Sequence, residues 1–313
     1  MTVLEVIQKS AEFLAKKDVE PSRLQAELLL SHALKLPRMK LYLNFERTLA
    51  PAELDAVREL VKRRSQREPL QHIVGSTSFC GLEMAVNRHV LVPRPETELL
   101  AEAGWKFMTA LSTATDPSCD TKSRSSRREE AHSEERSQSL LTSAATTALD
   151  FGTGSGCIAI ALAVKCPAAQ ITALEVSPEA LTIARENAAR NGVAERIYFV
   201  QGEGFAALPA NTRFDLIISN PPYIPTAEIA SLEPEVRDFD PRSALDGGTD
   251  GLDFYRLLAA QTAGFLQLGG KIMVEFGDGQ GDEVKSIFES QKWIVEALRE
   301  DYSQRQRILV ARR

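Results

Sequence analysis

The stretch Asn220-Pro221-Pro222-Tyr223 offers the most distinctive chemistry in the chain, and it directly follows an apolar run over 214–219 that is typical of a strand. A planar NH2 group is a poor nucleophile because its lone pair is delocalised, and a site can activate it by accepting its two N–H bonds. Asn220 offers a side-chain oxygen, and Pro221 offers a carbonyl oxygen with no N–H group of its own. Tyr223 can stack on a flat target. The stretch therefore predicts N-methylation, although two prolines after a strand are also typical of a simple chain reversal.

A glycine-rich segment, 150–156, precedes an apolar run over 157–164 that is typical of a helix. Glycine tolerates positive φ and lets a ligand approach without a Cβ, and the N-terminus of the following helix offers free N–H donors. A loop of this kind alone is weak evidence, because dinucleotide sites share it. The residues of this predicted cofactor loop are Gly152, Thr153, Gly154, Ser155 and Gly156.

An acidic residue, Glu175, ends the next predicted strand, where a doubly wound sheet usually binds ribose hydroxyls. The glycine pattern is D-x-G-x-G-x-G rather than G-x-G-x-x-G, and no second phosphate-binding element or hydride-transfer machinery is evident. These features favour S-adenosylmethionine over a nicotinamide cofactor. The switch-point rule then places a methyl donor at the glycine loop and an acceptor at Asn220 across one crevice.

Several further motifs, taken together and in order, resemble the release factor glutamine methyltransferase family of class I S-adenosylmethionine enzymes. They are 26–30, 68–75 with Phe79 and Gly81, 92–98, the glycine loop, 220–225, 244–248, and 275–277 with Gln280. The likeness runs almost from end to end. It implies methylation of the side-chain amide nitrogen (N5) of the glutamine in the Gly-Gly-Gln loop of peptide chain release factors, which modulates translation termination.

The resemblance implies a role for each matching position. The glycine loop would hold the methionine part of S-adenosylmethionine and Glu175 its ribose hydroxyls, while Glu203 and Gly204 would border the adenine. Asn220, Pro221, Pro222 and Tyr223 would bind the substrate amide; Asn220, Pro221 and Tyr223 would be the catalytic residues, and Asn220 would also border the cofactor. The chain departs from the family at 175 and 203, where aspartate is more frequent, and at 204, where an aromatic residue is common.

No residue is predicted to act as a general base, because an amide nitrogen becomes strongly acidic as it is methylated and water can take its proton. His72 and His89 are therefore interpreted as structural. Catalysis would come from positioning and from exclusion of water. We further hypothesise that Arg94 and Glu96, in a proline-rich segment, close over the cofactor or the substrate backbone.

Length and periodicity predict two domains in the 313 residues: an N-terminal helical domain over 1–75 and an α/β domain over 91–313, joined by a hairpin linker over 76–90. The resemblance implies that the first is a substrate-recognition domain and the second the methyltransferase domain. The expected fold class is α/β, a Rossmann-like class I methyltransferase sheet preceded by a small helical bundle. A polar insertion over 112–147 lacks the apolar residues that would stabilise a fold and is predicted to be disordered. The resemblance implies that the last strand enters the sheet antiparallel.

Composition narrows the possible partners. A net charge of −6 argues against direct nucleic-acid binding, which matters because adenine-N6 methyltransferases share the N-P-P-Y chemistry. The four cysteines show no C-x-x-C pairing, so neither a metal nor a disulfide is expected. The sequence shows no signal-like or membrane-spanning segment, so we expect a cytoplasmic protein. We also expect it to be a monomer. The alternatives left open are a glutamine methyltransferase of a ribosomal protein, a nucleic-acid adenine methyltransferase and a non-catalytic scaffold.

Overall fold

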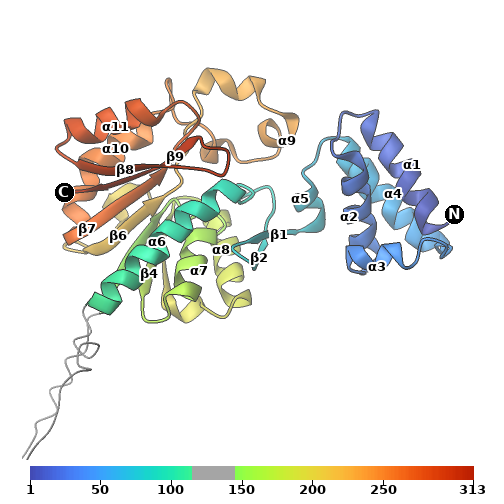
Figure 1. Cartoon of the computed structure of the whole chain (residues 1–313), viewed down its shortest axis with the longest axis horizontal. Coiled ribbons are helices and arrows are strands. Elements are labelled where there is room, and N and C mark those ends of the chain that lie inside the picture. The colour runs from blue at the N-terminus through green and yellow to red at the C-terminus, as the bar shows by residue number, and fades with distance from the viewer. Residues whose placement is uncertain (115–144) are drawn as a thin grey trace, which may run out of the picture.

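A helical bundle forms the N-terminal end of the chain in the computed structural model, which describes residues 1–114 and 145–313 (Figure 1). Its helices are α1 (Val3–Ala15), α2 (Ser22–Leu34), α3 (Arg38–Tyr42), α4 (Pro51–Ser65) and α5 (Leu70–Val74). All except α1 begin at or directly after a proline, where the missing N–H group costs no hydrogen bond. Buried leucines such as Leu14 and Leu29 pack the helices together.

A short hairpin follows the bundle and consists of β1 (Ser76–Phe79) and β2 (Leu82–Ala85), paired antiparallel. Its two turn residues, Cys80 and Gly81, both have positive φ, which matches the right-handed twist of the strands. Asn187, in α8 (Pro178–Arg190), fastens the hairpin by two hydrogen bonds to the backbone of Ala85: it accepts one from the N–H group at 2.6 Å and donates one to the carbonyl at 3.0 Å.

A seven-stranded sheet follows, with the strand order β5-β4-β3-β6-β7-β9-β8. The strands are β3 (Thr147–Phe151), β4 (Gln170–Glu175), β5 (Ile197–Gln201), β6 (Phe214–Ser219), β7 (Leu266–Glu275), β8 (Ile294–Glu300) and β9 (Gln306–Arg312). The first five strands in this order run parallel, whereas β9 runs antiparallel to both of its neighbours. The predicted Rossmann-like α/β class is confirmed, and so is an antiparallel last strand.

Helices cover both faces of the sheet (Figure 1). The first face carries α6 (Pro95–Ala114), α7 (Cys157–Lys165) and α8, and the second carries α10 (Asp253–Gln261) and α11 (Gly281–Ser290). Gly104 lets α6 approach closely, because a Cβ there would lie 3.0 Å from the Ile218 side chain. Covered faces explain why the central strands β3 and β6 are buried along almost their whole length.

The remaining described helical segments are short and lie in the connections between strands. They are η2 (Ala194–Arg196), η3 (Gly204–Ala207), η4 (Thr226–Ser231), α9 (Pro234–Arg237), η5 (Arg242–Ala244) and η6 (Thr262–Phe265). The connection that carries α9 reaches the helical bundle: Glu235 Oε1 lies 2.8 Å from Arg64 Nη2, and its Oε2 lies 2.6 Å from Arg67 Nη2. Arg64 is almost fully buried, so this ion pair links the two parts of the molecule.

Two sequence expectations concern the borders of elements. Of the insertion over 112–147, residues 112–114 complete α6 and Thr147 begins β3, whereas 115–144 lie outside the described residues. The apolar runs at 271–276 and 308–311 are typical of strands and lie in β7 and β9, whereas no comparable run marks β8 between them. That strand lies at the edge of the sheet and none of its residues is buried, so its hydrophobic pattern is weak.

Candidate functional site

The glycine loop leaves the carboxyl end of β3 and turns into α7. Its backbone is tied to the neighbouring strand, because the N–H groups of Gly152 and Thr153 both donate to the carbonyl of Leu174, at 2.9 and 3.0 Å. Gly152, Gly154 and Gly156 all have positive φ, which only glycine adopts without strain. A Cβ on Gly152 or Gly154 would meet no atom within 4 Å, so the loop borders open space at these two residues.

Gly156 has a different reason to be glycine. A Cβ at this position would lie 3.1 Å from the Cβ of Ala184, so the missing side chain lets α7 and α8 approach each other. The loop therefore combines two residues that leave room for a ligand with one that serves helix packing.

A buried carboxyl group, Asp150, holds the loop from beneath. Its Oδ2 accepts from the Thr153 hydroxyl at 2.6 Å and from the Ala159 N–H in the first turn of α7 at 3.0 Å. Burial raises the pKa of Asp150 to about 7, although these two hydrogen bonds oppose the shift. Sequence reasoning gave Asp150 no role of its own; the only signal was an acidic residue inside an apolar run.

Glu175 closes the loop from the side of β4. Its Oε2 accepts from the Gly154 N–H at 2.9 Å, and its Oε1 accepts from the N–H groups of Val176 and Ser177 at 3.0 Å each. The half-buried carboxylate thus fixes the shape of the loop. Its two oxygens have about four acceptor positions, so capacity remains for a hydroxyl group of a ligand.

Glu203 and Gly204 lie at the end of β5, which pairs with β4 through Glu175 and Gln201. Glu203 is exposed, and Gly204 has φ +58° with no atom within 4 Å of a Cβ built on it. The following Phe205 anchors this segment, because its ring stacks between those of Phe151 and Phe265. The carboxyl ends of the parallel strands β3, β4 and β5 thus lie side by side at one edge of the sheet.

The combined donor set fits S-adenosylmethionine. S-adenosylmethionine needs N–H donors for its amino-acid part, acceptors for its ribose and adenine, and room for all three. The loop N–H groups are the donors, and the carboxylates of Glu175 and Glu203 are the acceptors. The room lies above Gly152, Gly154 and Gly204. None of these features is specific alone, but the sequence predicted all of them for this one edge, and the structure brings them there.

Asn220 follows β6, the neighbour of β3 on the other side from β4. Its Nδ2 donates to the Thr97 hydroxyl at 3.0 Å, so its Oδ1 is the atom left to accept from a substrate. Ser219, one residue earlier, donates to the Phe151 carbonyl at 2.7 Å. This bond couples the end of β6 to the beginning of the glycine loop.

Pro221, Pro222 and Tyr223 continue from Asn220; Pro221 is buried, and the other two are half-buried. The carbonyl of Tyr223 accepts from the Gln280 side chain at 3.0 Å, which fixes the backbone of the stretch. Burial raises the pKa of Tyr223 to about 12, so its hydroxyl stays neutral. The ring is therefore suited to stacking rather than to proton transfer.

The glycine motif at 244–248 has a steric explanation in the same region. A Cβ on Gly247 would lie 2.8 Å from the Cα of Tyr223, too close for any other residue. The connection is also held by the Ile224 N–H, which donates to the Leu245 carbonyl at 3.0 Å. The motif thus lets the chain pack directly against the acceptor stretch.

Arg94 is engaged in an ion pair, and Glu96 is exposed. Arg94 Nη2 lies 2.9 Å from Asp240 Oδ2. Burial raises the pKa of Asp240 to about 6, with Arg94 opposing the shift. The hypothesis that Arg94 and Glu96 close over a ligand stays a prediction.

The two histidines differ in their surroundings. Burial lowers the pKa of His72, whereas His89 is exposed. Neither donates to or accepts from the residues of the predicted site in any described contact. Our assignment of no general base stays a prediction.

Two residues of this region carried no role in the sequence analysis, namely Thr97 and Glu275. Thr97 lies in the first turn of α6 and Glu275 ends β7, and both are almost fully buried. Burial raises the pKa of Glu275 to about 7. Both residues stand inside motifs that the sequence analysis quoted, and a carboxyl group at the end of an apolar strand was the available signal.

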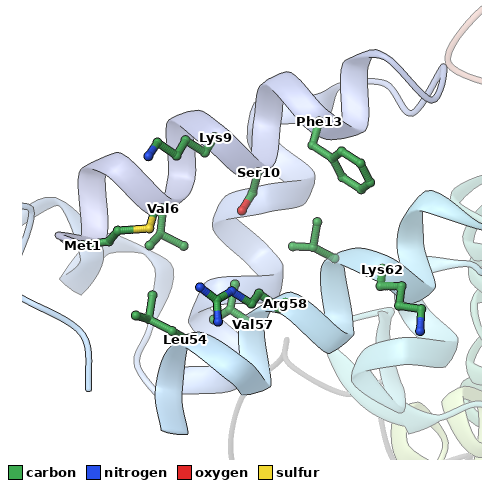
Figure 2. A pocket seen from close by; sticks show the side chains of 10 residues that line it. Met1, Val6, Lys9, Ser10, Phe13, Leu54, Val57, Arg58 and Lys62 are labelled. Carbon is green, nitrogen blue, oxygen red and sulfur yellow. The ribbon is translucent and has the colours of Figure 1, made fainter. Parts of the chain in front are cut away.

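A separate groove lies in the helical bundle between α1 and α4, with a volume of about 360 Å³ (Figure 2). Val6, Phe13 and Val57 contribute apolar side chains, and Lys9 and Lys62 contribute positive charge. None of its lining residues belongs to the predicted cofactor or acceptor site.

None of the helices in the described parts of the chain has the length and apolar character needed to cross a membrane.

Comparison with known proteins gives matches over both parts of the chain. A family model described as the PrmC N-terminal domain matches residues 5–75, and one described as the methyltransferase small domain matches residues 136–232. Among solved structures, a methyltransferase from Pyrococcus furiosus is similar at 18% identity and a TM-score of 0.48, covering 80% of this chain and 97% of that one.

Three curated relatives match over nearly the full length and share the printed name release factor glutamine methyltransferase. The protein of Geobacter sulfurreducens is 44% identical, covering 92% of this chain and 88% of its own. That of Chlorobaculum tepidum is 39% identical, covering 96% and 94%, and that of Moorella thermoacetica is 37% identical, covering 100% and 99%.

Proposed function

Because the chain belongs to the release factor glutamine methyltransferase family, we propose that it methylates the side-chain amide nitrogen (N5) of a glutamine in a peptide chain release factor, using S-adenosylmethionine. The target glutamine in this proposal is that of the Gly-Gly-Gln loop. One observation carries the assignment to this edge of the sheet: β3 and β6 are adjacent and parallel, so the glycine loop and Asn220 leave the sheet side by side.

The cofactor half of the proposed site consists of the glycine loop with Glu175, Glu203 and Gly204. S-adenosylmethionine supplies the methyl group from its sulfonium. The N–H groups at the start of α7 face the amino-acid part, and the two carboxylates accept from hydroxyl and amine groups. Asp150 keeps the loop in shape without touching the ligand.

The acceptor half consists of Asn220 to Tyr223. Asn220 Oδ1 and the Pro221 carbonyl accept the two N–H bonds of the glutamine amide, and the Tyr223 ring and Pro222 limit its rotation. The nitrogen lone pair is then directed at the methyl group. Holding two reactants in such geometry can contribute ~7 kcal/mol or more to lowering the barrier.

The proposed substrate is a folded protein, and the helical bundle with its groove between α1 and α4 offers a second contact surface for it (Figure 2). We also propose that the chain acts as a monomer in the cytoplasm and binds no nucleic acid directly; its net charge of −6 supports the last point. Gel filtration and a salt titration with DNA and RNA test these proposals.

The deciding experiment supplies the purified chain with radiolabelled methyl donor and, separately, a release factor, ribosomal proteins and nucleic acid. We expect label only on the release factor, at the amide nitrogen of one glutamine, and no label when that glutamine is replaced by alanine. Label on a ribosomal protein or on adenine would reassign the substrate. A chain that binds the donor but labels no acceptor would be a scaffold.

A further inference from the structure

A chain of polar side chains runs from Asn220 into the protein interior. The register of β6 and β7 pairs Ser219 with Val274, so the next residues, Asn220 and Glu275, leave the sheet next to each other. Thr97, in the first turn of α6, lies beside both: its hydroxyl accepts from Asn220 Nδ2 at 3.0 Å, and hydrogen bonding by Thr97 lowers the pKa of the buried Glu275 carboxyl group. Three elements far apart in sequence therefore meet at one amide group.

The chemistry of these groups decides which way the Asn220 amide faces. A hydroxyl has a single proton to donate, and an ionised carboxyl can only accept. When Glu275 is ionised, Thr97 gives its proton to Glu275 and presents lone pairs to Asn220. Only the Nδ2 group of Asn220 can then face inward, because Oδ1 would meet lone pairs.

Glu275 is built into this position and has no other side-chain role in the described part of the chain. It is 3% exposed, and its Oε2 is buried without a hydrogen-bond partner among the described residues. Hydrogen bonding by Asn220 likewise lowers the pKa of its carboxyl group. A buried carboxyl group held by so few partners is unfavourable for stability, which argues for a functional reason.

We propose that Glu275 is a positioning residue for methyl transfer, which acts through Thr97 to keep Asn220 Oδ1, rather than Nδ2, facing the substrate amide. The inference rests on the proposed function for its catalytic consequence, but the orientation of the amide can be measured without it. In the wrong orientation Asn220 would present N–H groups to the N–H groups of the glutamine. The acceptor site would then repel its substrate.

The charge of Glu275 gives the proposal a pH dependence. Burial raises the pKa of Glu275 to about 7; Glu96 raises it further, whereas Thr97, Arg307 and Asn220 lower it. The Tyr223 and Tyr255 hydroxyls, which also face Glu275, are neutral because burial raises the pKa of each. Below pH 7 a protonated Glu275 can donate to Thr97 or to Asn220 Oδ1, so the unique orientation is lost.

Two substitutions of Glu275 separate this role from simple packing. Glu275→Gln keeps the volume but offers both donors and an acceptor, and we expect turnover to fall ~100-fold with donor affinity unchanged. Glu275→Asp keeps the charge on a shorter side chain, and we expect its turnover to lie between those of the wild type and Glu275→Gln. A packing role predicts the opposite order, because Gln fills the space better than Asp.

Two controls complete the set. Thr97→Val removes the connecting hydroxyl and should resemble Glu275→Gln, whereas Thr262→Val removes a fully buried hydroxyl in η6 and should leave turnover unchanged. The double variant Glu275→Gln/Asn220→Ala should have the same turnover as Asn220→Ala alone, because Glu275 acts through Asn220. Additive losses would overturn the proposal.

The orientation itself can be followed by NMR of the side-chain NH2 group of Asn220, identified by its absence in Asn220→Ala. We expect one slowly exchanging set of signals in the wild type above pH 8 and a second set in Glu275→Gln or in the wild type at pH 6. Unchanged signals in Glu275→Gln would overturn the proposal even in a chain that methylates no release factor. An inactive wild type with these NMR changes would instead reject only the proposed function.

Discussion

The cofactor half and the acceptor half of the proposed site are built in different ways. In the cofactor half, carboxylates hold the backbone of nearby residues: Asp150 holds the loop that follows it, and Glu175 accepts three backbone N–H groups. In the acceptor half, the key residue is held by another side chain from a distant part of the sequence: Asn220 donates to the hydroxyl of Thr97, 123 residues away. Backbone contacts survive many substitutions, whereas side-chain contacts depend on each residue type. We therefore expect single substitutions to be more severe on the acceptor side.

The largest effect is expected for Asn220→Ala. Removal of the Oδ1 acceptor should lower turnover ~1,000-fold, comparable to loss of a preorganised hydrogen-bonding group in other active sites. Donor affinity should stay within about twofold, because no described contact joins the Asn220 side chain to the glycine loop. Single-turnover methylation and calorimetric titration of the donor measure the two quantities. Weakened donor binding with normal turnover would place Asn220 in the wrong half.

The difference between the halves also explains what the sequence could predict. The glycine loop, Glu175 and the strands around them lie in one continuous segment, and local rules for glycine turns and helix starts suffice to find them. Asn220 was found because its neighbours Pro221 to Tyr223 are chemically distinctive. Its orientation could not be found, since it depends on the pairing of β6 with β7, and register is a property of the folded sheet.

Two further features lay beyond local patterns. Asp150 and Glu275 both looked like strand residues, and only burial reveals that their carboxyl groups are inside the protein. The ion pair between Arg64 and Glu235 joins the helical bundle to the connection after β6, 171 residues later. Contacts of this kind arise from tertiary packing, so composition and periodicity cannot predict them.

The second prediction tests the cost of burying Glu275. Its folded pKa of about 7 lies above the ordinary value of 4.5, so its contribution to stability is fully present below pH 4.5 and is lost as the pH rises through 7. Glu275→Gln lacks this titration. As the pH rises from 5 to 8.5, its free energy of unfolding should therefore increase by about 2 kcal/mol relative to that of the wild type. Urea unfolding at both values measures it, with the exposed Glu46→Gln as control. A difference independent of pH would mean that Glu275 is not buried as described.

The third prediction concerns the cofactor half, where shape rather than side-chain chemistry should matter. Gly154→Ala adds a methyl group to the open space of the loop and should weaken donor binding ~10-fold. Gly192→Ala is the matched control: this glycine also has positive φ and nothing within 4 Å of a Cβ, but it lies in the turn after α8. Both variants suffer similar backbone strain, so the difference between their donor affinities reports occupation of the loop. Equal affinities would remove Gly154 from the site.

The smallest effect is expected for Glu203→Gln, at the far edge of the cofactor half. The side chain is exposed, and exposed charges contribute little, so donor affinity should fall only ~3-fold while turnover at saturating donor is unchanged. The exposed Glu186→Gln on α8 provides the control. A 100-fold loss would show that side chains dominate the cofactor half as well, and the contrast with Asn220 would fail. No loss at all would separate Glu203 from the adenine, leaving the glycine loop and Glu175 to hold the donor through the backbone they shape.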